Sequence, residues 1–136
     1  MNILFIEDDV MSIEPLVDHL RIRGHSIDIV DDVGDAQDRY SSQNYDIVFL
    51  DVMLPPGEYY TMQETADGRY TGLKLLESLR HIDSALGRNV RIFVLTNWRD
   101  EPQIDAACRS FRAEIIRKPM SIKMMDDLCN RVKSIS

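Results

Sequence analysis

The sequence contains no long hydrophobic run. No segment of the 136-residue chain approaches the roughly 18 consecutive apolar residues that a membrane span requires, although 44% of the residues are hydrophobic. The N-terminus also lacks the basic-then-apolar layout of a secretory signal peptide. We therefore expect a cytoplasmic protein without membrane association, and the length corresponds to one ordinary domain.

Positive charge is scarce relative to negative charge. The chain has 16 Lys and Arg residues against 23 Asp and Glu residues, which gives a net charge of -7 and a pI of about 4.9. An acidic surface repels the phosphates of DNA and RNA, and it cannot gain from the release of their counterions. Direct binding of nucleic acid is therefore not expected.

Residues that form disulfides or zinc sites are few. The two cysteines, Cys108 and Cys129, lie in separate segments without a CxxC spacing, so we expect both thiols to be reduced. The three histidines are scattered and form no cluster with the spacing of metal ligands. The sequence thus predicts neither a disulfide framework nor a histidine–cysteine metal centre.

Short apolar runs alternate with amphipathic helical patterns along the chain. Five runs have the length and composition of strands: Ile3–Ile6, His25–Val30, Ile47–Leu50, Val90–Leu95 and Ala113–Ile116. The predicted helices run from an N-cap at Ser12 to Gly24, from Asp35 to about Gln43, from Leu73 to near Gly87, from Pro102 to Phe111, and from Ile122 to Val132. This alternation predicts parallel strands joined by right-handed crossovers, which form a three-layer α/β sandwich.

Polar residues follow four of the five predicted strands. They are Glu7, Asp8 and Asp9 after the first strand, Asp51 after the third, Thr96 after the fourth, and Lys118 after the fifth. Ligands of such sheets bind at the carboxyl ends of the strands, so we expect these side chains to meet there. Convergent carboxylates form an oxygen-rich site for a hard divalent cation, usually Mg²⁺, which also relieves their mutual repulsion. A carboxylate is then available as a nucleophile toward phosphorus, with Lys118 neutralising the phosphoryl oxygens.

Five motifs occur in the order typical of one signalling family: ILFIEDD, DIVFLDVMLP, TGLKLLESLR, VLT and KP. On these motifs the chain resembles a response-regulator receiver domain, the phosphoacceptor module of two-component signalling, over essentially residues 1–136. The resemblance implies a flavodoxin-like fold with a five-stranded parallel sheet in the order 2-1-3-4-5 and five helices. It also implies a phosphoacceptor rather than a classical enzyme, with at most a weak autophosphatase activity.

The resemblance assigns a role to each residue at the acidic edge. Asp51 would accept the phosphoryl group from a histidine kinase or a phosphotransfer protein. Asp8 would bind Mg²⁺ directly together with Asp51, Glu7 would bind it through water, and the backbone carbonyl of Met53 would be a further ligand. Asp9 has no assigned role.

Three further residues are assigned to phosphoryl contact and to the local turn. Thr96 would hydrogen-bond the phosphoryl oxygen and move toward it, Lys118 would form a salt bridge to it, and Pro119 would hold the turn through a cis bond. The output would pass through the face of the fourth helix, fifth strand and fifth helix to a downstream protein target. A homodimer through the same face is allowed by the resemblance.

Two residues of the predicted output face depart from the family pattern. Ile115 stands three residues before Lys118, where receivers usually carry Tyr or Phe, so it either simply packs there or indicates signalling without an aromatic switch. Trp98 follows Thr96 by two residues, where the family varies. Its indole either shields the phosphoryl group from water, which predicts slow hydrolysis, or serves as an exposed docking residue.

A third departure is an insertion at about 57–71, between the third strand and the third helix. It contains Tyr59, Tyr60 and Tyr70, and its ADG sequence predicts a small hairpin with the arms EYYTM and RYT. Loops of this length are usually functional or disordered. The alternatives are a mobile surface loop and a lid or partner-contact element.

Other α/β proteins fit the sequence less well. A phosphatase of the haloacid-dehalogenase type carries its nucleophile in a DxD pattern after the first strand, whereas here that strand ends in EDD. A flavin-binding flavodoxin needs hydroxyl groups and N–H donors there, and three acids would repel the phosphate.

The remaining alternative is a pseudo-receiver, an unphosphorylated binding or dimerisation scaffold. Such a protein would lack one or more of the five site residues, Glu7, Asp8, Asp51, Thr96 and Lys118, all of which are present.

Overall fold

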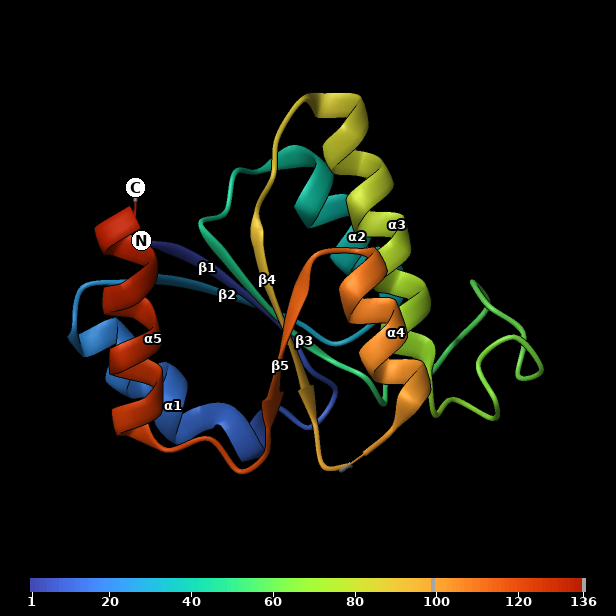
Figure 1. Ribbon diagram of the computed structural model, residues 1–136. Helices are drawn as coiled ribbons and strands as arrows, with labels where there is room; N and C mark the ends of the chain where they lie inside the picture. Colours follow the sequence, from blue (N-terminus) through green and yellow to red (C-terminus); the bar gives the residue numbers. More distant parts are fainter. Residues whose placement is uncertain (99, 136) are drawn as a thin grey trace.

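The computed structural model describes residues 1–98 and 100–135 and contains a five-stranded parallel sheet in the order β2-β1-β3-β4-β5 (Figure 1). The strands are β1 (Asn2–Ile6), β2 (Ser26–Val30), β3 (Ile47–Asp51), β4 (Arg91–Thr96) and β5 (Ala113–Arg117). The helices are α1 (Val10–Ile22), α2 (Val33–Ser42), α3 (Thr71–Leu86), α4 (Pro102–Ser110) and α5 (Ile122–Ile135). The predicted three-layer α/β fold and its strand order are confirmed.

The helices cover both faces of the sheet because strand side chains point alternately to opposite sides. Leu4 and Ile6 of β1 belong to the core beneath α2, α3 and α4, whereas Ile3 and Phe5 belong to the core beneath α1 and α5. Figure 1 shows α1 and α5 on one side of the strands and the other three helices on the opposite side. In the described part of the chain, no helix has both the length and the apolar character needed to cross a bilayer.

Three helices, α1, α2 and α3, begin earlier than the sequence patterns predict, and α3 begins at Thr71 rather than at Leu73. The expected N-cap of α1, Ser12, lies inside the helix, and its hydroxyl donates to the carbonyl oxygen of Asp9 at 2.7 Å. The chain therefore becomes helical directly after the acidic run. In α2 the N-cap is Asp32, whose carboxylate accepts the Asp35 N–H at 2.7 Å, so Asp35 is the capped residue and not the start.

Gly72 allows α3 to begin directly against the end of β3. Its N–H donates to the carbonyl oxygen of Val52 at 2.8 Å. A Cβ atom at this position would lie 2.6 Å from the Cα of Val52 and would also overlap the carbonyl oxygen of Asp51. Because those atoms belong to the backbone, they cannot move aside cheaply, and glycine is needed to bring α3 this close to Asp51.

The insertion contains turns and no strand, so the predicted hairpin is wrong. The N–H of Thr61 donates to the Glu64 carboxylate, and the N–H of Glu64 donates to the Thr61 hydroxyl, each at 2.9 Å. This reciprocal pair is a capping box, which starts a helical turn rather than an extended arm. A turn bond from the Thr65 N–H to the Thr61 carbonyl follows at 3.3 Å.

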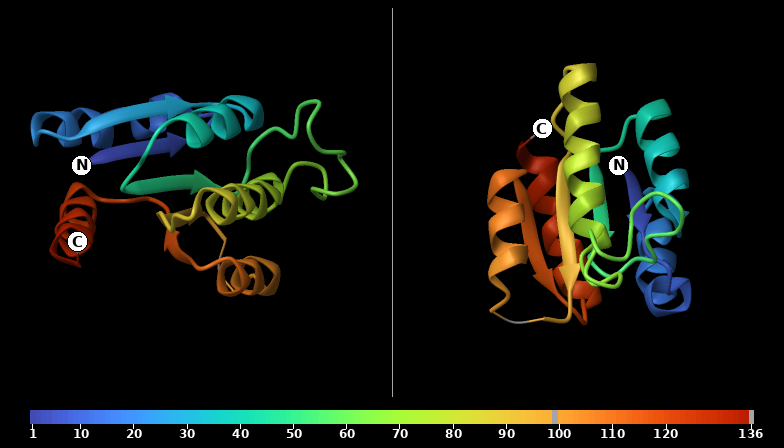
Figure 2. Two further views of the ribbon diagram at one scale, coloured as in Figure 1. Left: turned by 90° about the horizontal axis from the view of Figure 1, so that it is seen from above. Right: turned by 90° about the vertical axis from the view of Figure 1, so that its right-hand side faces the viewer.

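The three tyrosines of the insertion contact different parts of the domain. Tyr59 lies against Gly34 of α2, where there is no room for a Cβ atom. Tyr60 packs on the core and lies close to Ser78 of α3. Tyr70 packs on the core and against the ring of Trp98, which follows β4. The insertion, drawn in green in Figure 2, projects from the sheet beside α3.

A buried polar network fastens α3 to its neighbours. Asp83 accepts hydrogen bonds from the Tyr40 hydroxyl at 2.7 Å, from Arg80 at 2.8 Å and from Arg88 at 3.1 Å. The other Arg80 donors reach three backbone carbonyl oxygens, those of Val90, Phe111 and Arg112. Every described polar atom of this network that is fully buried has a partner. The network therefore connects α2 and α3 with the chain before β4 and β5.

We expect Asp83→Ala to lower the free energy of unfolding by about 3–5 kcal/mol, because it leaves a buried guanidinium group without its carboxylate. Tyr40→Phe is the matched control and should cost only about 1 kcal/mol, since Asp83 keeps both arginines. Urea unfolding followed by circular dichroism measures both values. Equal small losses in the two variants would show that the ion pair does not carry this stability.

Candidate functional site

Three carboxylates meet at the carboxyl edge of the sheet. Glu7 and Asp8 follow β1, Asp51 ends β3, and one oxygen of each lies within 4.8 Å of the other two. Glu7 and Asp51 are 1% and 5% exposed, whereas Asp8 is open to solvent. The predicted convergence of these acids thus exists, and its solvent side is formed by Asp8.

Lys118 brings the end of β5 to the same point. Its Nζ lies 3.0 Å from Oε2 of Glu7 and 3.4 Å from Oδ2 of Asp51. The Lys118 N–H also donates to the Thr96 carbonyl at 2.8 Å, which ties the end of β5 to the end of β4. The Lys118–Pro119 bond is cis, as predicted. One ammonium group therefore bridges two carboxylates from different strands.

The protonation equilibria of this group reflect burial and crowded negative charge. Burial raises the pKa of Glu7 to about 7, Asp51 adds to the rise, and Lys118 opposes it without cancelling it. Partial burial and the charge of Glu7 also raise the pKa of Asp8. For Lys118, burial acts to lower the pKa, but Asp51 and Glu7 outweigh it and the net direction is upward. The site thus favours additional positive charge.

The donor set fits a hard divalent cation. Glu7, Asp8 and Asp51 offer only oxygen atoms, which are the ligands that Mg²⁺ prefers, and soft sulfur ligands are not part of the group. The exposed position of Asp8 allows an ion to enter while it keeps several water molecules. The Met53 N–H donates to Oδ1 of Asp51 at 3.1 Å, so the backbone after β3 turns around the carboxylate.

Thr96 is buried at the end of β4, with its hydroxyl oxygen engaged by the main chain. This oxygen accepts the Trp98 N–H at 3.0 Å. The Trp98 indole lies outside the acidic group, edge-on to the Tyr70 ring at 5.8 Å and beneath the Arg69 guanidinium at 4.8 Å. The sequence motifs did not point to Arg69, whose only signal was its place beside Tyr70 in an aromatic-rich insertion.

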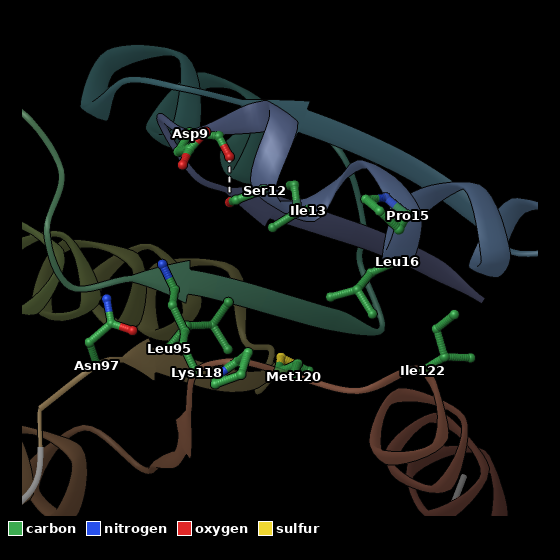
Figure 3. Close-up of a pocket in the computed structure, with 11 residues that line it drawn as sticks. Asp9, Ser12, Ile13, Pro15, Leu16, Leu95, Asn97, Lys118, Met120 and Ile122 are labelled. Atoms are coloured by element: carbon green, nitrogen blue, oxygen red, sulfur yellow. Dashed lines mark hydrogen bonds between the residues drawn. The ribbon is translucent and has the colours of Figure 1, made fainter.

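A cavity of about 450 Å³ opens next to Lys118 (Figure 3). It lies between α1, with Ile13 and Leu16, and the segment after β5, with Met120 in the connection and Ile122 at the start of α5. Lys118 lines this cavity and its side chain is 22% exposed, so it is reachable from solvent.

The sequence matches one known protein family over most of its length. The model described as the response regulator receiver domain matches residues 3–133. The chain belongs to the response regulator receiver domain family. It is a signalling domain of two-component systems, and receiver domains generally bind Mg²⁺ at an acidic pocket, which corresponds here to the cluster of Glu7, Asp8 and Asp51.

A sequence relative agrees with this membership. The chain is similar to the swarming motility regulation protein RssB of Serratia marcescens, with 28% identity over 136 residues. The alignment covers 100% of this chain and 53% of RssB, so the chain spans about half the length of that relative.

Solved receiver structures share the fold at low sequence identity. A two-component response regulator from Clostridium difficile aligns with a TM-score of 0.78 and 21% identity, covering 98% of this chain and 96% of that chain. A CheY-like receiver protein from Methanospirillum hungatei gives 0.76 and 15%, covering 98% and 94%. The chemotaxis protein CheY4 of Vibrio cholerae gives 0.73 and 17%, covering 96% and 97%.

The pH dependence of the receiver's stability follows from Glu7. Because its folded-state pKa of about 7 lies above the ordinary value of 4.5, the contribution of Glu7 to stability is full below about pH 4.5 and is lost as the pH rises through 7. We expect Glu7→Gln to remove up to about 3 kcal/mol of this pH-dependent loss, since one pKa unit corresponds to about 1.4 kcal/mol. The measurement is urea unfolding in the presence of a chelator from about pH 5 to about pH 8. A difference between wild type and Glu7→Gln that does not change with pH would contradict it.

Proposed function

We propose that Asp51 is the phosphoacceptor of this receiver and takes a phosphoryl group from the phosphohistidine of a histidine kinase or phosphotransfer protein. The observation that carries the proposal is the meeting of Asp51, Lys118 and two further acids at one edge of the sheet. Asp51 is a carboxylate at the end of a buried strand, with an ammonium group 3.4 Å from one of its oxygens. Such a pair can act as nucleophile and neutralising charge.

The transfer is a substitution at phosphorus. A carboxylate oxygen of Asp51 forms a bond to phosphorus while the P–N bond of the phosphohistidine breaks, and its electron pair returns to the imidazole ring. The product is an acyl phosphate on Asp51. Lys118 is placed to balance the charge of the phosphoryl oxygens, and Thr96 supplies a hydroxyl group that can donate to one of them.

Asp8, Asp51 and the backbone carbonyl of Met53 are the proposed direct ligands of Mg²⁺, with Glu7 acting through water. When bound, the ion supplies positive charge to the phosphoryl oxygens during transfer. The residues themselves keep two acids and one ammonium group in place for this purpose, and the exposed Asp8 leaves the ion open to exchange.

The output of the switch is proposed to lie on the face of α4, β5 and α5. Thr96 ends β4 and Lys118 follows β5, so both residues that would contact the phosphoryl group lie at one end of this face. A change in their positions can therefore alter how the face binds a downstream protein or a second copy of the chain. The alternative is an unphosphorylated scaffold, and phosphorylation by acetyl phosphate distinguishes the two functions.

Incubation with acetyl phosphate and Mg²⁺ should add one phosphoryl group to the protein, visible by intact-mass spectrometry. We expect Asp51→Asn to abolish the adduct, because the amide is a poor nucleophile. Asp9→Asn is the matched control and should keep the adduct, since Asp9 belongs to the same acidic run but lies outside the carboxylate group.

Two results would contradict the proposal. An adduct that persists in Asp51→Asn would place the phosphoryl group elsewhere. No adduct with acetyl phosphate or with a phosphorylated histidine phosphotransfer protein would favour the scaffold.

Trp98 is proposed to slow hydrolysis of the acyl phosphate. It is half-buried and follows Thr96 closely, and its indole is held in place by Tyr70 and Arg69. We expect Trp98→Ala to increase the rate of dephosphorylation several-fold, because water reaches the phosphoryl group more freely. The decay of the phosphorylated mass after removal of the donor measures this rate, and an unchanged rate rejects the shielding role.

A further inference from the structure

We propose that Tyr70 and Arg69 are positioning residues which hold Trp98, and through its backbone the hydroxyl group of Thr96, in the resting arrangement of the receiver. The insertion would then replace the aromatic side chain that receivers usually carry at the position of Ile115. This inference rests on the proposed function, because phosphorylation of Asp51 is the event that releases the arrangement.

The backbone of Trp98 is tethered on both sides. Its N–H donates to the Thr96 hydroxyl oxygen at 3.0 Å, and its carbonyl oxygen accepts from Nη1 of Arg117 at 2.6 Å. A movement of the Thr96 oxygen away from the Trp98 N–H lengthens or breaks the first bond. That movement is unfavourable unless another acceptor replaces the oxygen, because it leaves a backbone N–H without its partner. Trp98 therefore responds directly to the position of Thr96.

The indole of Trp98 is held by the insertion. The Tyr70 ring meets it edge-on, with centroids 5.8 Å apart and an interplanar angle of 79°, and the Arg69 guanidinium lies 4.8 Å from its centroid. The Tyr70 side chain also lies close to Glu101, the residue before α4, which raises the pKa of Tyr70. The contacts of Tyr70 and Arg69 thus connect the loop after β4 with the insertion and with the start of α4.

The cavity beside Thr96 leaves little space for another side chain to move when Thr96 is displaced. The cavity bordered by Thr96, Ile104 and Ile115 measures about 10 Å³, close to the smallest volume that holds one water molecule. No aromatic ring can enter it, and Ile115 already packs on the core beside it. A displacement of Thr96 is therefore transmitted outward through Trp98 to Tyr70 and Arg69.

The experiment uses the fluorescence of Trp98, which is the only tryptophan of the sequence. Phosphorylation with acetyl phosphate and Mg²⁺ should change the emission wavelength of Trp98 and its quenching by acrylamide, relative to Mg²⁺ alone. Tyr70→Ala should show the shifted emission before phosphorylation and little further change. Tyr70→Phe keeps the ring contact and should restore most of the response, which distinguishes positioning from a general loss of structure.

Two further variants test whether the response depends on the residues that contact Trp98. Tyr59→Ala is the matched control, because it removes a tyrosine of the same insertion that contacts α2 instead of Trp98, and it should respond like wild type. Arg69→Gln changes an exposed side chain and should reduce the response, so the test does not depend on the folding of Tyr70→Ala.

Intact-mass spectrometry of the same samples separates the possible failures. An adduct on Asp51 with unchanged Trp98 emission, or an equal shift in wild type and in Tyr70→Ala, overturns the positioning role alone. The absence of any adduct overturns the proposed function and this inference together.

Discussion

Two buried carboxylates, Glu7 and Asp51, share the ammonium group of Lys118 at the carboxyl edge of the sheet. Each acid comes from a different strand, and a buried carboxylate is costly unless a positive charge lies beside it. The single ammonium group does not fully compensate for burial and repulsion, as the pKa of Glu7 of about 7 indicates. This imbalance is the physical reason why a divalent cation suits the site.

The fold supports this arrangement through close packing around β3. Gly72 lets α3 begin against the backbone of Asp51 and Val52, and the network around Asp83 fastens the other half of α3 to the chain before β5. The turn that follows Asp51 and the chain that leads into β5 are therefore both attached to one helix. Rigid attachment of this kind keeps a small displacement at the site from being absorbed locally.

The long segment between β3 and α3 packs against several parts of the domain. Its tyrosines contact α2, α3 and the Trp98 loop, so the segment is joined to three parts of the domain. Ile115 and the small volume beside Thr96 leave no space for an inward aromatic movement. The Trp98 loop is instead joined to the insertion through Arg69 and Tyr70.

The sequence by itself determined the alternation of strands and helices and the set of polar residues at one edge, because side-chain periodicity and parallel connections depend on neighbours along the chain. The strand order came from the family motifs and is confirmed. The hairpin was wrong, since the Thr61–Glu64 capping box competes with the turn signal of ADG. Only the tertiary structure decided that Arg69 and Tyr70 meet Trp98. These residues are far apart in sequence, and their contact depends on how a long loop closes over the folded domain.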